Sequence, residues 1–387
     1  MKLAKSVNRL GTEAVYNIFA KTKKLEKQGK KIIDLSLGQS DFRSPKHAVD
    51  AAIKALKDGH HGYTLPNGII ECREAVSRKI NNLYKANIDP ERIIIIPGGK
   101  LTMHHAISFF GEPGAEIIYP DPGFPIYESM INFTGAKGVS YNMTENKDFS
   151  ISPDKILSLI NEKTRLLILN NPHNPTGGFT EKNVIDKLAN GLKNFPNLAI
   201  LSDEIYDRLI FDNKEIPTLL NYPDLYDRLI ILNGWSKTYA MTGWRLGWSV
   251  WPEKLIECVF KFCVNSHSCV NTPAQYGAIA ALDGPENHLN DMMKEFAIRR
   301  KLIVDGLRSL KGVECSLPGG SFFVFPNVKK TGMNGEEFTE KCLQEAGVAI
   351  ISGTAFGKFA VDNVRFNFAT SRENISKAIE KIDKVLK

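Results

Sequence analysis

Short apolar runs alternate with segments of helical spacing between residues 92 and 250. The apolar runs are 92–97, 116–119, 165–170, 198–202, 229–233 and 246–250, and residues 181–192 form one of the helical segments between them. Such alternation is typical of a mainly parallel sheet with crossover helices on its faces. The pattern therefore predicts an α/β fold, in which ligands gather at the carboxyl ends of the strands.

The pattern changes from residue 285 onward and predicts a separate α+β unit. The expected elements are a helix at 290–310, a strand at 321–325, a helix at 335–346, and strands at 348–351 and 363–368. A capping-box pattern at Thr370–Glu373 predicts the start of the last helix. We expect an amphipathic N-terminal helix to pack on this unit. The predicted domains are a large one over 46–284 and a small one from 1–45 and 285–387.

Composition narrows the classes of protein that fit. The chain has 387 residues, of which 43% are hydrophobic and 24% charged, as in ordinary globular proteins. No apolar run approaches the roughly 18 residues of a membrane span. The net charge is +7, and the basic residues are spread along the chain. The sequence shows no nucleic-acid-binding motif, so no nucleic-acid partner is expected. The N-terminus lacks an apolar signal core, which favours a cytoplasmic protein, and the cysteines lack metal-ligand spacing.

The most informative residue is Lys237. It follows the apolar run at 229–233 and precedes Arg245, which lies between Gly243 and Gly247. A lysine placed at the end of a buried strand can form an imine with an aldehyde whose phosphate the arginine holds. Pyridoxal 5'-phosphate (PLP) is the aldehyde that fits. Because such a Lys–Arg spacing usually reflects only surface charge, the interpretation depends on the other residues.

Three further positions meet the demands of this cofactor. Asp203, at the end of the 198–202 run, can keep the ring nitrogen protonated. Tyr206 is close enough in sequence to offer its hydroxyl to the phenolate oxygen of the ring. Asn174, in the loop at 170–178, can donate an amide NH2 to the same oxygen. Taken singly, these segments could be ordinary turns, since Asn, Asp, Pro and Gly dominate turns.

Two more groups of residues suit phosphate and carboxylate binding. Gly98 and Gly99 follow a predicted strand and precede a helical stretch, where backbone N–H groups bind phosphate well. Arg245 would complete this cradle with a charge-assisted fork. Arg365 lies within the alternating strand at 363–368 and could clamp a substrate carboxylate. It would do so only if its side of the strand faces the cleft; otherwise it is a solvated edge residue.

These motifs occur together in a recognisable order. They are Leu37-Gly38, Tyr63, Gly98-Gly-Lys100, Phe124, Asn174-Pro-Thr-Gly177, Asp203-x-x-Tyr206, Ser236-Lys237, Arg245 and Arg365. In this combination the chain resembles the fold-type I PLP-dependent aminotransferases of class I/II, the aspartate aminotransferase-like superfamily. It is most similar to the bacterial and archaeal branch that contains aspartate aminotransferases. The resemblance runs from Asp34 to the C-terminal helix and implies the PLP-transferase fold, with a mainly parallel seven-stranded sheet.

The resemblance also implies roles for individual residues. Tyr63 matches a tyrosine that reaches the phosphate of the neighbouring subunit's cofactor, which implies a homodimer. Phe124 matches the aromatic residue that stacks on the cofactor ring, and Ser236 a position that often binds phosphate. Lys100 is expected among the cofactor-binding residues of the Gly98-Gly-Lys100 turn, and it also matches a lysine that helps bind the distal carboxylate of the substrate. The implied substrate-binding residues are Gly38, Asn174 and Arg365.

Two positions depart from the family pattern. Gly234 stands where many members have a serine that binds phosphate. Glu13 lies near a segment where relatives that take acidic substrates often have a small hydroxyl residue. A carboxylate there would repel an acidic side chain unless it is paired. Phe124, Tyr127 and Phe322 are expected near the cleft and leave aromatic or aliphatic donors open, and His267 or Asn271 could line the pocket.

The expected activity is therefore transfer of an amino group between an L-amino acid and a 2-oxo acid by a ping-pong mechanism. Lys237 would be the base at Cα, and aspartate or glutamate are the favoured donors because of Lys100. Aromatic- or alanine-type aminotransferases and PLP-dependent carbon–sulfur lyases are the alternatives, since a fold does not determine a reaction. A nucleotide-binding α/β protein is not indicated, because no Gly-x-Gly-x-x-Gly turn or Walker loop is present.

Overall fold

The computed structural model describes residues 1–143 and 148–387. Within this part of the chain, seven strands form one sheet in the order β2-β8-β7-β6-β5-β3-β4. The strands are β2 (Ile93–Ile96), β3 (Glu116–Asp121), β4 (Lys137–Asn142), β5 (Thr164–Asn170), β6 (Ala199–Asp203), β7 (Leu229–Gly234) and β8 (Gly247–Val250). β8 runs antiparallel to both of its neighbours, and the other pairs are parallel. The predicted α/β fold with a mainly parallel sheet is confirmed.

The apolar runs became strands because the middle of the sheet is buried on both faces. In β7, Leu229 and Ile231 belong to one core cluster, whereas Ile230 and Leu232 belong to the cluster on the opposite face. Strands buried in this way carry apolar residues at every position. Within this seven-stranded sheet, the strand that was not predicted is β4. It lies at the edge of the sheet, is partly exposed, and has the mixed sequence Lys-Gly-Val-Ser-Tyr-Asn.

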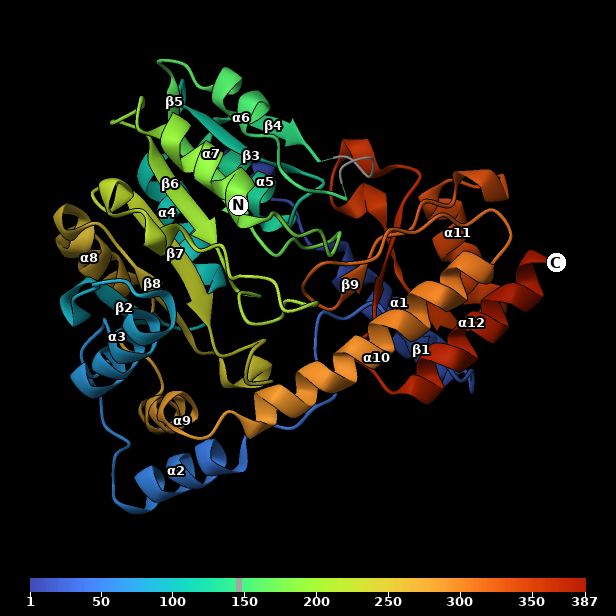
Figure 1. Cartoon of the computed structure of the whole chain (residues 1–387), viewed down its shortest axis with the longest axis horizontal. Helices are drawn as coiled ribbons and strands as arrows, with labels where there is room; N and C mark the ends of the chain where they lie inside the picture. The colour runs from blue at the N-terminus through green and yellow to red at the C-terminus, as the bar shows by residue number, and fades with distance from the viewer. Residues whose placement is uncertain (144–147) are drawn as a thin grey trace.

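Helices cover both faces of this sheet (Figure 1). One face carries α3 (Ile70–Tyr84), α6 (Pro153–Leu159), α7 (Lys182–Leu192) and α9 (Thr272–Asp283), and α2 (Lys46–Lys57) packs on α9. The other face carries α4 (Lys100–Phe110), α5 (Ile126–Thr134) and α8 (Ile256–Ser266). No helix in the described residues is both long enough and apolar enough to cross a membrane.

A second group of elements lies beside the sheet and has its own core (Figure 1). Its helices are α1 (Ala14–Lys27), α10 (Asn287–Ser309), α11 (Gly335–Lys341) and α12 (Arg372–Leu386). Its strands are β1 (Ile33–Asp34), β9 (Phe323–Val324), β10 (Val348–Ala349), β11 (Ile351–Ser352) and β12 (Val364–Asn367). β1 pairs with β10, so both ends of the chain contribute to this group. We propose that the domain boundaries lie near residues 45 and 285.

The start of α12 differs from the prediction. Ser371, not Thr370, is the N-cap, and its hydroxyl accepts the backbone N–H of Asn374 at 3.1 Å. Glu373 does not reach back to complete a capping box; it pairs with Lys377 one turn further on, at 2.5 Å. A side-chain pair four residues apart on an exposed helix face competes with the cap for the same carboxylate.

Candidate active site

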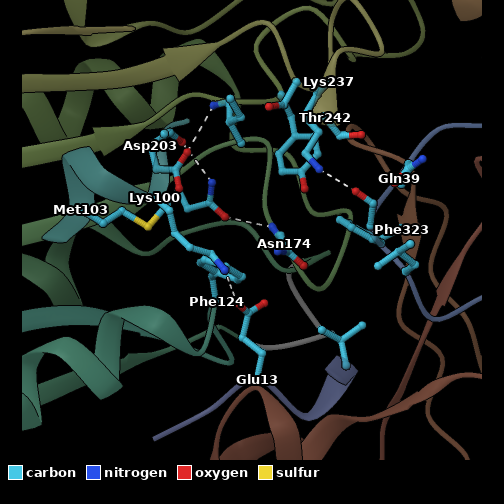
Figure 2. Close-up of a pocket in the computed structure, with 18 of the residues that line it drawn as sticks. Glu13, Gln39, Lys100, Met103, Phe124, Asn174, Asp203, Lys237, Thr242 and Phe323 are labelled. Atoms are coloured by element: carbon cyan, nitrogen blue, oxygen red, sulfur yellow. Dashed lines mark hydrogen bonds and ion pairs between the residues drawn. The ribbon is translucent and has the colours of Figure 1, made fainter. Parts of the chain in front are cut away.

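A cavity of about 260 Å³ lies at the carboxyl ends of the parallel strands (Figure 2). We call it the central cavity. Most of the site residues predicted from the sequence line it, although they come from segments far apart in the chain. These residues are Gly38, Gly99, Lys100, Phe124, Asn174, Asp203, Tyr206, Ser236, Lys237, Arg245 and Arg365. Gly98, which precedes Gly99 and lies against Arg245, is not among them, and neither is Tyr63.

Lys237 enters the cavity from the turn after β7. The turn is anchored by the fully buried Trp235, whose indole N–H donates to the carbonyl of Ala278 at 3.1 Å. The Nζ of Lys237 donates to the carbonyl of Gly38 at 2.6 Å. Burial lowers the pKa of Lys237 to about 8, and the positive charges of Arg365 and Arg245 act in the same direction. About a tenth of this amine is therefore neutral, and nucleophilic, at pH 7, against less than about a thousandth of an ordinary lysine.

Asp203 ends β6 and is 2% exposed. The hydroxyl of Tyr127 donates to its Oδ2 at 2.6 Å, and the backbone N–H of Ile205 donates to Oδ1 at 3.2 Å. Burial raises the pKa of Asp203 to about 6 despite these bonds. Tyr127 was expected near the substrate, but it is completely buried behind Asp203. Two donors therefore fix the position of the Asp203 carboxylate. The carboxylate can accept a hydrogen bond from a protonated ring nitrogen.

Arg365 faces the cavity and is not an edge residue. It lies in β12, the middle strand of its sheet, and is 5% exposed. Its guanidinium donates to Asn174 Oδ1 at 2.9 Å and to the carbonyl of Ser36 at 2.6 Å, while Nε is buried without a partner. No ion pair in the described residues includes Arg365. A buried cation without an anion is unfavourable, so this position suits a carboxylate ligand.

Gly98 and Arg245 form the other anion-binding part of the cavity. Gly98 has a φ of +83°, and a Cβ added to it would clash with the guanidinium of Arg245. Arg245 is itself fixed by donating to the carbonyl of Thr242 at 2.8 Å.

α4 begins directly after Gly99, and no side chain caps it. The backbone N–H of Leu101 already donates to the carbonyl of Gly98 at 3.2 Å, whereas the N–H groups of Gly99 and Lys100 have no partner among the described residues. A helix N-terminus beside an arginine is well suited to a phosphate.

The cavity wall differs in part from the expectations. The ring centroid of Phe322 lies 5.5 Å from the Nζ of Lys237, so this residue is near the cavity as expected, but it is fully buried, and the next residue, Phe323, lines the cavity. His267 lies outside the cavity, with its Nε2 3.2 Å from the carbonyl of Pro66. Asn271 caps α9. Successive residues of a strand point to opposite faces, so an error of one position in β9 exchanges the two phenylalanines.

Tyr63 is 93% exposed and lies outside the cavity of its own chain. Several residues that were not predicted from the sequence also line the cavity, among them Gln39, Met103 and Thr242. Each had a signal in the sequence, because it lies next to Gly38, one helical turn after Gly99, or three residues before Arg245. Residues next to a motif residue, or one helical turn away from it, were therefore candidates for the cavity wall, although they are not part of the motif itself.

The remaining charges in the cavity form an ion pair. The Nζ of Lys100, at the start of α4, contacts Oε1 of Glu13, just before α1. Figure 2 shows the two side chains directed at one another beside Phe124. The Glu13 side chain is 12% exposed, and Lys100 also lies 5.5 Å from the ring centroid of Phe124. The carboxylate that departs from the family pattern is therefore paired.

Comparison with known proteins assigns this geometry to a class. A crystal structure of the aspartate aminotransferase from Rhizobium meliloti matches with a TM-score of 0.95 and 27% identity, covering 100% of this chain and 99% of that one. The fold is thus that of the aspartate aminotransferase-like PLP enzymes.

The sequence comparisons identify the family. Residues 30–382 match the family described as aminotransferase class I and II, and the chain belongs to it. A "Probable aspartate aminotransferase" of Methanocaldococcus jannaschii is 38% identical over 353 residues, 90% of this chain and 91% of that protein. An "Aromatic-amino-acid aminotransferase 2" of Thermococcus litoralis is 34% identical over 359 residues, 92% of each chain. The protein is a PLP-dependent aminotransferase of this family, whose members differ in substrate.

Proposed function

We propose that the protein transfers the amino group of an L-amino acid to a 2-oxo acid by a ping-pong mechanism, with aspartate or glutamate favoured. The observation that carries this proposal is the pairing of two groups in one cavity. Arg365 is a buried guanidinium whose Nε has no partner, and Lys237 is an amine with a lowered pKa. An amino acid carries the complementary carboxylate and, one bond away, the Cα–H that such an amine can deprotonate.

The residues of the cavity fit the cofactor of the family. Bound PLP would supply an aldehyde that joins to an amine, and a ring that accepts electrons from Cα. Asp203 would hold the proton on the ring nitrogen, and Asn174 and Tyr206 would donate to the phenolate oxygen. Ser236, Arg245 and the N–H groups at the start of α4 would bind the phosphate. Asn174 already presents its oxygen to Arg365, which leaves its NH2 group to donate.

The reaction follows from the positions of these side chains. Arg365 and Asn174 would hold the α-carboxylate and so fix the orientation of Cα. The neutral form of Lys237 would remove the proton from Cα and deliver it to C4', the former aldehyde carbon of the cofactor, on the other side of the amino nitrogen. Phe124 and Phe323, which line the cavity, would keep water away from the developing negative charge.

The preference for acidic donors rests on Lys100, whose ammonium group lines the cavity. Relatives named for aspartate support it, whereas the relative named for aromatic amino acids supports the aromatic alternative. An alanine-type enzyme and a carbon–sulfur lyase remain alternatives to test. We also propose a homodimer in which Tyr63 reaches the site of the partner subunit, because this tyrosine is almost completely exposed.

Replacing Lys237 by alanine tests the assignment. The variant should lose both the absorbance of the lysine-bound cofactor and measurable turnover of an amino acid with 2-oxoglutarate. Lys261→Ala, an exposed position on α8, serves as the control and should retain both. Normal turnover by the Lys237→Ala variant would overturn the assignment. Sustained release of ammonia from an amino acid without an oxo acid would instead indicate a lyase.

A further inference from the structure

The pair formed by Glu13 and Lys100 is the charged part of the central cavity that neither the proton transfer nor the binding of the α-carboxylate uses. In the part of the chain that the structure describes, the charged residues that line the cavity are four cations and two carboxylates: Lys100, Lys237, Arg245, Arg365, Glu13 and Asp203. The phosphate would take Arg245, the ring nitrogen Asp203, and the α-carboxylate Arg365, while Lys237 is the reacting amine. Glu13 and Lys100 are therefore the charges left to face the substrate side chain.

The contacts of Glu13 allow it to move away from Lys100. Its carboxylate has one hydrogen-bond partner among the described residues, the Nζ of Lys100. It lies at the N-cap of α1 but makes no capping bond. Glu13 also acts on the charges at the centre of the cavity, because it raises the pKa of Arg365 against the larger, lowering effect of burial. A competing carboxylate would have to break a single ion pair to replace it.

A ping-pong reaction requires the substrate pocket to bind two different amino acids, and the pair of Glu13 and Lys100 can serve both. One pocket must hold two different side chains in turn. An uncharged side chain that covers an unpaired ammonium group would remove it from water without compensation, which is unfavourable. With Glu13 in place, the covered group is a neutral pair. A side-chain carboxylate can instead take the position of Glu13 on Lys100, because it offers the same charge-assisted bond.

We propose that Glu13 is a displaceable counter-ion of Lys100, which lets one pocket accept an uncharged side chain in one half-reaction and a carboxylate side chain in the other. This rests on the proposed aminotransferase function. Glu13 thereby determines specificity without taking part in the proton transfer. The enzyme would use aspartate or glutamate together with a second, uncharged amino acid, such as an aromatic one.

The test is to measure single half-reactions of the PLP-loaded enzyme with aspartate and with phenylalanine. Each is run without a 2-oxo acid, and the change in cofactor absorbance gives its rate. In Glu13→Gln the efficiency with aspartate should rise about tenfold and that with phenylalanine should fall about tenfold, since Lys100 loses its partner. Maleate, an unreactive dicarboxylate, should bind more tightly by calorimetry. Glu26→Gln, an exposed position on α1, removes the same charge outside the cavity and should change neither.

A second variant separates specificity from structural damage. Adding Lys100→Met to Glu13→Gln removes both charges. The double variant should recover the efficiency of the half-reaction with phenylalanine, while the half-reaction with aspartate stays slow. An equal change for both amino acids in Glu13→Gln, or no recovery in the double variant, would overturn the role of Glu13. An unchanged affinity for maleate would do so independently of catalysis. If the loaded wild-type enzyme reacted with no amino acid at all, the proposed function itself would be wrong.

Discussion

Burial brings the pKa values of the two central residues toward neutrality from opposite sides. The pKa of Lys237 is lowered to about 8 and that of Asp203 is raised to about 6. Removal from water disfavours the charged form of each group, whatever its sign. An amine so placed can act as a base near neutral pH, and a carboxylate so placed depends on its donors to stay ionised.

The lowered pKa of Lys237 predicts a distinct reactivity in the cofactor-free protein. The amine is protonated below about pH 8 and neutral above it. Its rate of acetylation should rise as the pH passes through 8 and then level off, whereas an ordinary lysine continues to gain reactivity up to about pH 10. Mass spectrometry of peptides from one digest measures both, with the other lysine peptides as internal reference. A continued rise at Lys237 would contradict the effect of burial.

Tyr127 should tune Asp203 without touching the substrate. Its hydroxyl bond lowers the pKa of Asp203, so Tyr127→Phe should raise that pKa and move the acidic limb of the pH–kcat profile to higher pH. Loss of one bond to a charged group should reduce kcat about tenfold at neutral pH. Tyr119→Phe removes a hydroxyl that bonds the exposed Glu128 and is the control. A uniform loss at every pH would indicate only structural damage.

At the scale of the elements, the site depends on the turns that follow parallel strands. Each turn presents one chemical group: β2 leads to Gly98 and α4, β5 to Asn174, β6 to Asp203 and β7 to Lys237. Because these strands run the same way, their carboxyl ends meet at one edge of the sheet. β12 then supplies Arg365 from the second group of elements.

Replacing Gly98 by alanine tests whether the turn between β2 and α4 binds the cofactor phosphate. Gly98→Ala places a Cβ against Arg245 in a left-handed backbone conformation. Gly114→Ala is the matched control, because Gly114 has a φ of +95° but no atom within 4 Å of an added Cβ. Both variants should lose about 1–2 kcal/mol of folding stability from backbone strain, measured by thermal unfolding. Only Gly98→Ala should also weaken cofactor binding in a spectrophotometric titration. Equal cofactor affinity in the two would argue against a phosphate at this turn.

At the scale of the whole molecule, the cavity lies between the large sheet and the second group of elements. Arg365 and Gly38 come from that group, and Lys237 and Asp203 come from the sheet. No segment of the chain could build this site alone. The role proposed for Tyr63 would require a second chain to complete the site.

Complementation between two inactive variants tests the proposed homodimer. Lys237→Ala lacks the reacting amine, and Tyr63→Ala lacks the residue that would reach across. If Tyr63 acts in the partner's site, mixed dimers contain one intact site, and a refolded equimolar mixture should recover about a quarter of wild-type activity. Each variant alone provides the baseline. If Tyr63 acts within its own chain, the mixture should show only the mean of the two separate activities.

The sequence by itself determined the sheet and the chemical groups at its edge. Central strands are buried on both faces, so they appear as unbroken apolar runs, and the residues that follow them necessarily lie at the carboxyl edge. This is why Lys237, Asp203 and Asn174 could be predicted from the order of residues alone. The edge strand β4 gave no such signal, because it is partly exposed and mixed in composition.

Only the tertiary structure decided which side chains from distant segments meet. It placed Tyr127 on Asp203, Phe323 in place of Phe322 in the cavity wall, and Glu13 on Lys100. These contacts depend on how the helices and the second group of elements pack against the sheet. The spacing of residues along the chain does not predict that packing. It indicates which residues share one face of a helix or strand, but not which other element that face contacts.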